Sequence, residues 1–293
     1  MAAKSLPGLR RPGSEAKEVK GFWQANRWLI LRRLSQVIVL GLFLLGPLAG
    51  IWILKGNLSA SMVLDTVPLA DPFIVMQSVL AGHFPELSVL LGAGIITVFY
   101  AVLGGRVFCS WVCPVNPVTD LAGALRRWLD IKKSSRLNKS MRWWLLALAW
   151  LLPLITGYVV WELVNPVSIL HRGILFGMGW GWIVILGIFL FDLFVSRRGW
   201  CGHLCPMGAC FTLIGSASTV RVSAANRENC NDCMDCFAVC PEPQVIKPAL
   251  KGQSNGIGPV ILAADCTNCG RCIDVCAQDV FKFGTRFANK AEK

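Results

Sequence analysis

Long runs of apolar residues, separated by shorter polar segments, occupy much of the chain up to residue 195. Four of these runs are long enough to cross a bilayer as helices, which takes about 20 residues. They lie at residues 34–54, 87–103, 143–161 and 174–195. The first contains a Gly46-Pro47 pair and the third contains Pro153, and membrane helices tolerate both residue types. The pattern therefore predicts a mainly α membrane protein with four transmembrane helices.

The overall composition supports a lipid-facing surface. Apolar residues make up 54% of the 293 residues, charged residues make up 16%, and the mean hydropathy is +0.55. Such a chain is too apolar to be disordered and more apolar than an ordinary soluble enzyme. Its 13 cysteines are confined to residues 109–276 of a long chain, which argues against a small secreted disulfide scaffold. The cysteines instead indicate metal binding.

The net charge of +12 is distributed unevenly along the chain. Eight Lys or Arg residues precede residue 34, eight lie within residues 106–142, and eleven lie from residue 197 onward. The two other connections between the apolar runs hold one each, Lys55 and Arg172. By the positive-inside rule we expect a multi-pass protein of the bacterial inner membrane with cytoplasmic N- and C-termini. The charge is thus a topology signal, and no nucleic-acid partner is expected.

One motif points weakly to another topology. Arg32-Arg33, followed by Leu34, Ser35 and an apolar run, resembles a twin-arginine export signal. The run is long for a signal peptide, and no convincing small-residue cleavage site follows it. We therefore predict an uncleaved first span.

Eight of the cysteines form two runs near the C-terminus. Both runs have the spacing C-x2-C-x2-C-x3-C, and Pro241 follows the first. In two-cluster ferredoxins the fourth cysteine of each run ligates the other cluster. Zinc is the alternative, since paired C-x2-C also binds that ion. We predict two [4Fe-4S] clusters, with Cys230, Cys233, Cys236 and Cys276 on cluster A and Cys266, Cys269, Cys272 and Cys240 on cluster B.

This tail departs from the compact ferredoxin pattern in two places. Ala277 replaces the usual proline after the second run. The connection at residues 241–265 is rich in glycine, proline and lysine, so we expect an irregular excursion. It is either a partner-docking surface or a tolerated insertion.

The remaining cysteines include two copies of C-x3-C-P. Each copy follows an even-numbered apolar run, and an arginine, Arg106 or Arg198, precedes each by three residues. Three interpretations remain open: ligands of an additional iron-sulfur cluster, a redox-active thiol set, or structural thiols at the membrane face. Cys210 is left over and is expected to be a small buried residue. The four motif cysteines are Cys109, Cys113, Cys201 and Cys205.

Two predicted periplasmic connections carry groups that accept protons. Quinol oxidation releases two protons, so it needs a histidine or carboxylate near the membrane edge. His83 with Asp71 and Glu86, or Glu162 with His171, would fit that role. No motif supports either set, and ordinary solvent-exposed side chains are the alternative. The sequence does not choose between menaquinol and ubiquinol.

These features divide the chain into five predicted parts. Residues 1–33 form a basic cytoplasmic segment, and residues 34–198 form the transmembrane domain. Residues 199–225 form a membrane-face segment with the second C-x3-C-P motif and a linker. Residues 226–285 form an α+β domain like a two-cluster bacterial ferredoxin, and residues 286–293 form a tail.

The whole pattern resembles the NapH family, the ferredoxin-type membrane components of the quinol dehydrogenase that serves periplasmic nitrate reductase. NosR-type regulators and accessory proteins of cytochrome oxidase assembly are similar in the same cysteine runs. The resemblance covers nearly the whole chain. It includes Asn26-Arg27-Trp28, Arg32-Arg33 with Ser35-Gln36, Lys55-Gly56-Asn57-Leu58, Ala81-Gly82-His83, and the run from Arg106 to Pro114.

This resemblance implies an electron-transfer subunit that oxidises quinol. Its electrons would pass to a periplasmic iron-sulfur partner and through it to nitrate reductase. The alternative functions are a membrane-bound factor that assembles or senses iron-sulfur enzymes, and a scaffold that docks a catalytic partner. One tension remains, because the charge pattern places the ferredoxin-type clusters in the cytoplasm while nitrate is reduced outside.

Overall fold

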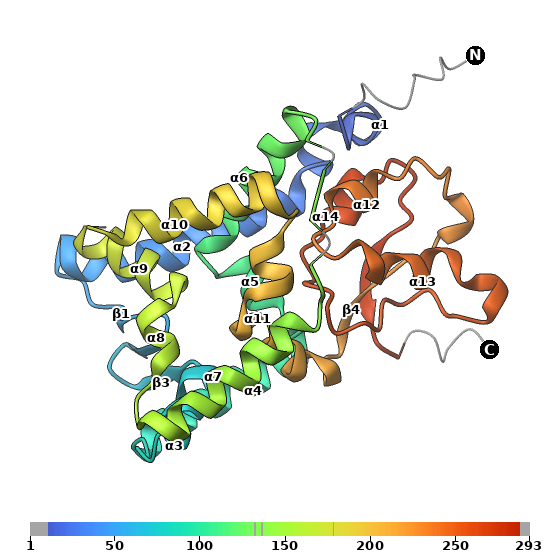
Figure 1. The fold of residues 1–293 in the computed structure, drawn as a ribbon. Helices are drawn as coiled ribbons and strands as arrows, with labels where there is room; N and C mark the ends of the chain where they lie inside the picture. Colours follow the sequence, from blue (N-terminus) through green and yellow to red (C-terminus); the bar gives the residue numbers. More distant parts are fainter. Residues whose placement is uncertain (1–10, 132, 136, 178, 288–293) are drawn as a thin grey trace.

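The computed structural model describes residues 11–131, 133–135, 137–177 and 179–287. Figure 1 shows an elongated arrangement, with a helical domain at one end and a smaller C-terminal domain, drawn in orange and red, at the other. The N-terminal helix α1 (Ser14–Gln24) lies beside the C-terminal domain. Both described ends of the chain therefore lie at the same end of the molecule.

The first two predicted spans form helices. Helix α2 (Arg27–Ala49) begins seven residues earlier than expected and ends at Gly50, whose left-handed backbone (φ 71°) stops it before the predicted end at residue 54. Helix α4 (Leu87–Leu103) has the predicted bounds and ends before Gly104. In both cases a glycine closes an apolar run, which is the usual way that a helix ends.

The third and fourth spans differ from the prediction because glycines interrupt them. Helix α7 (Met141–Thr156) ends at Gly157 (φ 70°), so Trp161 belongs to the separate short helix α8 (Val160–Val164). Residue 174 lies in helix α9 (Pro166–Phe176), which ends at Gly177. The fourth apolar helix begins only with α10 (Gly181–Leu190) and continues into the π-helical turn η1 (Phe191–Val195).

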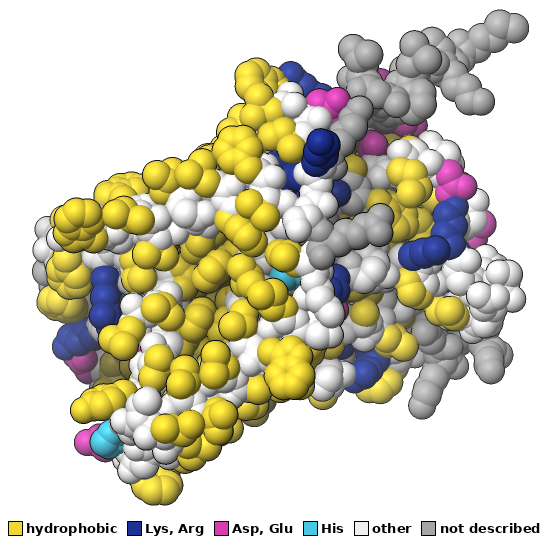
Figure 2. Space-filling model, viewed as in Figure 1, with side chains coloured by type: hydrophobic (Ala, Val, Ile, Leu, Met, Phe, Trp, Pro, Cys, Tyr) yellow, Lys and Arg dark blue, Asp and Glu magenta, His cyan; other side chains and the backbone are white. Residues whose placement is uncertain are grey.

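Helix α2 alone, among the described helices, is both long and apolar enough to span a bilayer by itself. Helices α4, α7 and α10 with η1 are apolar but shorter. Large apolar side chains nevertheless lie exposed on all of them, and Figure 2 shows hydrophobic side chains over most of the visible face of the helical domain. Such an extended apolar surface is unusual for a soluble monomer.

The segment between α2 and α4 forms a small folded unit that the hydrophobic pattern did not predict. Strands β1 (Leu54–Gly56), β2 (Ala60–Val63) and β3 (Val67–Ala70) make an antiparallel sheet in that order. Helix α3 (Pro72–Leu80) follows, and the Asp71 side chain caps it by accepting a hydrogen bond from the Phe73 N–H. This unit lies at the end of the helical domain away from the C-terminal domain (Figure 1).

The two C-x3-C-P motifs lie in corresponding short elements. The first spans α5 (Val107–Trp111) and the start of α6 (Val115–Trp128), and the second spans the π-helical turn η2 (Trp200–Leu204) and the start of α11 (Pro206–Ile214). Helix α11 is almost wholly buried in the core of the helical domain. The segment at 199–225 therefore contributes α11 to the core of the helical domain, and its last residues, including Val222, belong to the core of the C-terminal domain. The short turn η3 (Gly215–Ala217) follows.

The C-terminal domain has the α+β character expected of it. Strands β4 (Val220–Ser223) and β5 (Lys282–Thr285) pair antiparallel, and helices α12 (Asp235–Val239) and α14 (Arg271–Val275) each lie between two cysteines of one run. The connection at 241–265 is more ordered than expected. It contains helix α13 (Ile246–Lys251), which buries apolar side chains in the domain core, flanked by the turns η5 (Pro243–Val245) and η6 (Gln253–Asn255). The turn η4 (Arg227–Asn229) precedes the first run.

Candidate metal centres and a buried cavity

The eight C-terminal cysteines gather around two separate small cavities. Four of them line one cavity together with Leu250 and Phe281, and the other four line a second cavity together with Val222 and Ile261. The fourth cysteine of each run lies with the first three of the other run, as predicted. The first cavity holds Cys230, Cys233, Cys236 and Cys276, and the second holds Cys240, Cys266, Cys269 and Cys272.

The loops around both cavities repeat one backbone conformation. Asp232 and Met234 in the first run have positive φ angles of 58° and 63°, and Asn268 and Gly270 have 46° and 71° at the equivalent places. These left-handed residues turn the chain sharply between successive cysteines. The repetition explains how two runs of the same spacing wrap two cavities in the same way.

Backbone N–H groups surround the thiols of both cavities, an arrangement that suits iron-sulfur clusters. Within the described chain, no three His, Cys, Asp or Glu side chains converge closely enough to hold a single metal ion. A zinc ion would need its four sulfurs at about 2.3 Å from one point. The N–H donors are Asp235 to Cys233, Phe237 to Cys236, Glu242 to Cys240, Asn268 to Cys266 and Arg271 to Cys269.

The four C-x3-C-P cysteines form a third group of neighbours, in the helical domain beside the second cavity. Burial raises the pKa of all four thiols, and charges on other members of the group raise it further in Cys113, Cys201 and Cys205. Buried thiols of this kind ionise only if a cation compensates their charge, which is what a metal ligand requires. The remaining thiol, Cys210, is buried in α11 as expected.

A helix begins just after the second cysteine of each C-x3-C-P motif, so that its N-terminus lies beside the thiol. The backbone N–H groups of Val115 and Asn116 at the start of α6 lower the pKa of the Cys113 thiol and so favour its ionised form. In the same way, N–H groups of the first turn of α11 lower the pKa of the Cys205 thiol. A helix N-terminus stabilises negative charge, so both motifs present a thiol where a thiolate is favoured. The proline that follows each cysteine allows this turn because helices accept proline in their first positions.

Direct hydrogen bonds join the first C-x3-C-P motif to the loop of the second cavity. Ser110 Oγ donates to the Thr267 carbonyl at 2.8 Å, and Trp111 Nε1 donates to the Asn268 carbonyl at 3.2 Å. A small cavity between the domains is bordered by Cys109 and Cys201 on one side and by Cys269 on the other. The third thiol group and the second cavity are therefore adjacent.

Each arginine that precedes a C-x3-C-P motif pairs with a buried carboxylate. The Arg106 guanidinium lies 2.8 Å from Glu242 Oε1, and both side chains are buried at the domain junction. Lys139 contacts the other Glu242 oxygen at 2.6 Å. Burial would raise the pKa of Glu242, but Arg106 and Lys139 lower it to about 2. The carboxylate is therefore ionised and ties the C-terminal domain to the helical domain.

Asp120 on α6 is the carboxylate that pairs with Arg198, and the two groups lie 2.5 Å apart. Arg33 and Arg271 also form ion pairs with this carboxylate, and Arg32 lies 3.7 Å away. Burial opposes ionisation of Asp120, yet the charges of Arg198 and Arg271 hold its pKa well below the usual range. Nothing in the sequence pattern pointed to this carboxylate as the centre of an arginine cluster.

The predicted proton acceptors lie in different places from one another. His83 is exposed and contacts the Gly157 carbonyl at 3.2 Å, whereas Asp71 is buried. Glu162 pairs with Arg172, while His171 is buried against Phe43 with neither ring nitrogen hydrogen-bonded. Within the described residues, no hydrogen bond or ion pair joins Glu162 to His171 or Asp71 to His83. Glu86 precedes the first turn of α4.

Asp71 lines an apolar cavity of about 190 Å³ inside the helical domain. The cavity is enclosed by α2, the small sheet, α4, α5 and α11, and Tyr100 and Ser61 supply its other polar side chains. Phe108 and Val112 also line it, and each directly precedes a motif cysteine. Burial raises the pKa of Asp71 to about 7, and the nearby Glu162 charge adds to this. The cavity thus carries one carboxyl group that can exchange a proton near neutral pH.

Comparisons with known proteins agree with these cysteine groups. A family model described as a 4Fe-4S binding domain matches residues 86–132 and 178–221, which include both C-x3-C-P motifs. A second model, described as a 4Fe-4S dicluster domain, matches residues 229–280. Both matches support iron-sulfur binding.

Individual relatives cover nearly the whole chain. Ferredoxin-type protein NapH of Escherichia coli strain K12 is 50% identical over 97% of this chain and 98% of its own length. NapH of Haemophilus influenzae is 50% identical over 96% of this chain and 97% of its own length. The methylamine utilization ferredoxin-type protein MauN of Methylorubrum extorquens is also 50% identical, over 93% of this chain and 94% of its own length. No solved structure matches the chain. The chain therefore belongs to the NapH family of ferredoxin-type electron transport proteins with 4Fe-4S domains, to which MauN is also similar.

Proposed function

We propose that this chain is a multi-pass subunit of the bacterial inner membrane that oxidises quinol and passes the electrons through its iron-sulfur clusters. Its acceptor is a periplasmic iron-sulfur partner and, through that partner, nitrate reductase. Because the C-terminal clusters lie on the cytoplasmic side in the proposed topology, the electrons must cross the membrane to reach that acceptor. One observation carries the proposal: the apolar cavity at Asp71, the four C-x3-C-P thiols and the two ferredoxin-type cavities follow one another along the molecule.

The surface of the helical domain supports the membrane part of the proposal. Helices α2, α4, α7 and α10 expose large apolar side chains, which lipid would cover. The basic segments at 106–142 and from 197 onward lie toward the C-terminal domain, whereas β1–β3 and α3 lie at the opposite end. With positive charge on the cytoplasmic side, the four helices cross the membrane and both termini lie in the cytoplasm.

The Asp71 cavity suits the ring of a quinol that enters from lipid. Its walls are mostly apolar, with a few polar side chains among them, as in small-molecule sites generally. In the proposed step one quinol loses two electrons and two protons and becomes quinone. The ionised Asp71 carboxylate takes one proton as a quinol O–H bond breaks and passes it to the neighbouring Glu162, which leads toward the surface. Asp71 is then ionised again and takes the second proton, which leaves by the same route as the second O–H bond breaks.

Bound [4Fe-4S] clusters supply one-electron redox chemistry, so the two electrons leave the quinol singly. The positions of the residues in this chain set the order in which the redox centres follow one another. Phe108 and Val112 separate the cavity from Cys109 and Cys113. Ser110 and Trp111 then join the first motif to the Thr267-Asn268 loop of cluster B. The C-x3-C-P thiols, proposed as ligands of a third cluster, occupy the position between quinol and cluster B.

The identity of the final acceptor rests on the NapH resemblance. A methylamine utilization protein, MauN, has the same 50% identity to the chain as NapH has. Both relatives are named as ferredoxin-type proteins, which supports an iron-sulfur electron carrier whichever enzyme it serves. Nitrate reductase is the acceptor we propose for this chain.

The role of Asp71 can be tested with the cluster-containing protein in lipid nanodiscs under anaerobic conditions. Reduction of the clusters by menaquinol or ubiquinol is followed by absorbance at several pH values. Because only the ionised carboxylate accepts a proton, we expect the rate to rise as the pH passes about 7, with Asp71 titrating there. In Asp71→Asn the rate is expected to fall by about 100-fold and to lose this pH dependence.

Asp65→Asn is the matched control, since Asp65 lies in the same connection and is exposed beside Lys55. It should leave the rate within about twofold of the unsubstituted protein. Equal rates in Asp71→Asn and the unsubstituted protein would remove Asp71 from the reaction. Failure of both quinols to reduce the unsubstituted protein, with its oxidised partner present, would contradict the proposed function itself.

A further inference from the structure

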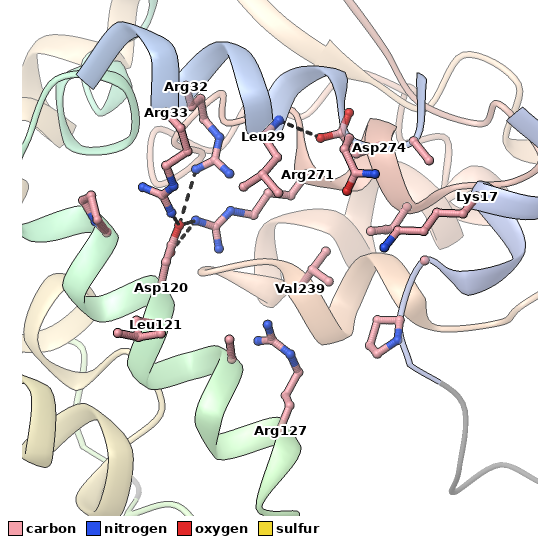
Figure 3. Close-up of a pocket in the computed structure, with 17 residues that line it drawn as sticks. Lys17, Leu29, Arg32, Arg33, Asp120, Leu121, Arg127, Val239, Arg271 and Asp274 are labelled. Atoms are coloured by element: carbon pink, nitrogen blue, oxygen red, sulfur yellow. Dashed lines mark hydrogen bonds and ion pairs between the residues drawn. The ribbon is translucent and has the colours of Figure 1, made fainter. Parts of the chain in front are cut away.

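A large basic pocket lies where the N-terminal helix, the helical domain and the C-terminal domain meet. Its volume is about 430 Å³, and it is lined by residues of α1, α2, α6, α12 and α14. Figure 3 shows Arg32, Arg33 and Arg271 directed toward Asp120, with Arg127 on α6 facing the opening and Lys17 at its side. Five basic side chains line the pocket, against only the two carboxylates of Asp120 and Asp274.

Both carboxylates are already committed to other contacts. Asp120 pairs with Arg33, Arg198 and Arg271. Asp274 accepts hydrogen bonds from the Trp28 and Leu29 N–H groups, at 3.1 and 2.9 Å, and so caps the first turn of α2. The residues that line the pocket therefore carry more positive than negative charge, and the cluster B cysteines Cys269 and Cys240 are the acidic groups outside the lining that act on Arg32 or Arg271.

Arg32 is the strongest sign that the pocket is made for an anion. Its side chain is fully buried, yet none of its three guanidinium nitrogens has a hydrogen-bond partner in the described chain. Its nearest carboxylate, on Asp120, lies 3.7 Å away and is shared with other arginines. Buried donors without partners are costly, and a guanidinium is shaped to bind oxyanions with two parallel hydrogen bonds. Arg127 likewise forms no ion pair within the residues described.

The other walls of the pocket are mostly apolar. Leu29, Leu121, Val239 and Val275 contribute apolar surface beside the charged groups. The pocket also lies at the start of α2, whose next turns expose apolar side chains such as Val37. A phosphate group would meet the arginines, and any acyl chains attached to it would continue along α2.

We propose that this pocket binds the phosphate group of an anion, either an anionic phospholipid at the cytoplasmic membrane surface or free phosphate. The lipid alternative rests on the proposed membrane location, whereas the free-phosphate alternative does not. Because α1, α2, α6 and α14 all border the pocket, the bound phosphate also fastens the C-terminal domain to the helical domain.

Two probes distinguish the two sources. Full-length cluster-containing protein in neutral detergent is titrated calorimetrically with inorganic phosphate. The same protein is placed in phosphatidylcholine nanodiscs with or without phosphatidylglycerol, and retained lipid is measured by native mass spectrometry. Retention of phosphatidylglycerol with weak phosphate binding supports the lipid, and saturable phosphate binding without lipid retention supports the free anion.

Arg127→Gln is the informative variant, because Arg127 is exposed at the rim and its loss should leave the fold intact. Loss of a charged hydrogen-bond donor should weaken binding of the effective probe by about tenfold. Arg27→Gln is the control, since Arg27 lies at the start of α2, which also borders the pocket, but stacks on Trp28 and does not line the pocket. The proposal is overturned if neither probe binds, or if Arg27→Gln weakens binding as much as Arg127→Gln.

Discussion

Buried charged residues such as Glu242 and Arg106 connect the two domains. Their pairing could not be predicted from the sequence pattern. Glu242 lies two residues after a cysteine run, where a polar residue of no special role would be unremarkable. Its partner Arg106 was recognised only as part of a repeated motif. The pairing joins residues 136 positions apart, so no local spacing reveals it. The eight C-terminal ligands were predictable because their own spacing encodes the cluster.

Glu242→Gln is expected to destabilise the protein by about 3 kcal/mol, because it leaves the buried Arg106 charge without its partner. The pKa of Glu242 is lowered to about 2, so the stabilisation is complete above the ordinary glutamate range and is lost as the pH falls through that range toward 2. Thermal unfolding of the cluster-containing protein at neutral pH measures the loss, and proteolysis between the domains should become faster.

Asp65→Asn serves as the comparison, since it removes a carboxylate from an exposed pair with Lys55. Exposed pairs contribute between zero and about 1 kcal/mol, so this variant should be nearly neutral. A Glu242→Gln protein as stable as Asp65→Asn would show that the buried pair does not hold the domains together.

At the scale of elements, the apolar runs predicted where helices form but not where they end. Helix α4 had the predicted bounds because its run is uninterrupted between Glu86 and Gly104. The third and fourth runs cross left-handed glycines, which break them into α7, α8, α9 and α10. The burial of α11 was also unpredictable, because its apolar residues fit a protein core as well as a membrane surface.

The close contact of the turn between α4 and α5 with the end of α11 predicts a strong effect of one small substitution. A Cβ atom on Gly105 would lie 1.7 Å from the Phe211 carbonyl oxygen and 2.4 Å from the Gly215 nitrogen, so backbone would have to move. Gly105→Ala should therefore cost about 3 kcal/mol or more in thermal unfolding. Gly94→Ala on α4 is the control, because nothing lies within 4 Å of its Cβ position. Equal stabilities of the two variants would contradict this packing.

The two C-x3-C-P elements predict the metal content. If Cys109, Cys113, Cys201 and Cys205 hold a third [4Fe-4S] cluster, anaerobically purified protein should contain about twelve irons per chain. Cys205→Ser should then lower the count to about eight, whereas Cys210→Ser, on the same helix, should leave it unchanged. Iron and sulfide analysis provides the measurement. About eight irons in the unsubstituted protein would show that these four thiols hold no such cluster.

At the scale of the whole molecule, the elements form a path from a cavity in the helical domain to the C-terminal domain. The composition predicted an apolar domain and a cysteine-rich tail, and the structure places the third thiol group between them. The sequence could not reveal the cavity, because its lining comes from five separate parts of the chain. The same holds for the basic pocket at the domain junction.

The most direct measurement is low-temperature electron paramagnetic resonance of the full-length protein after anaerobic mixing with quinol. We predict reduced [4Fe-4S] signals from the C-terminal clusters in the unsubstituted protein. Cys109→Ala should lose these signals with quinol, although dithionite, which reaches the clusters from solution, should still produce them. If Cys109→Ala responds to quinol as fully as the unsubstituted protein, the electrons do not pass through the C-x3-C-P thiols and the proposed relay is wrong.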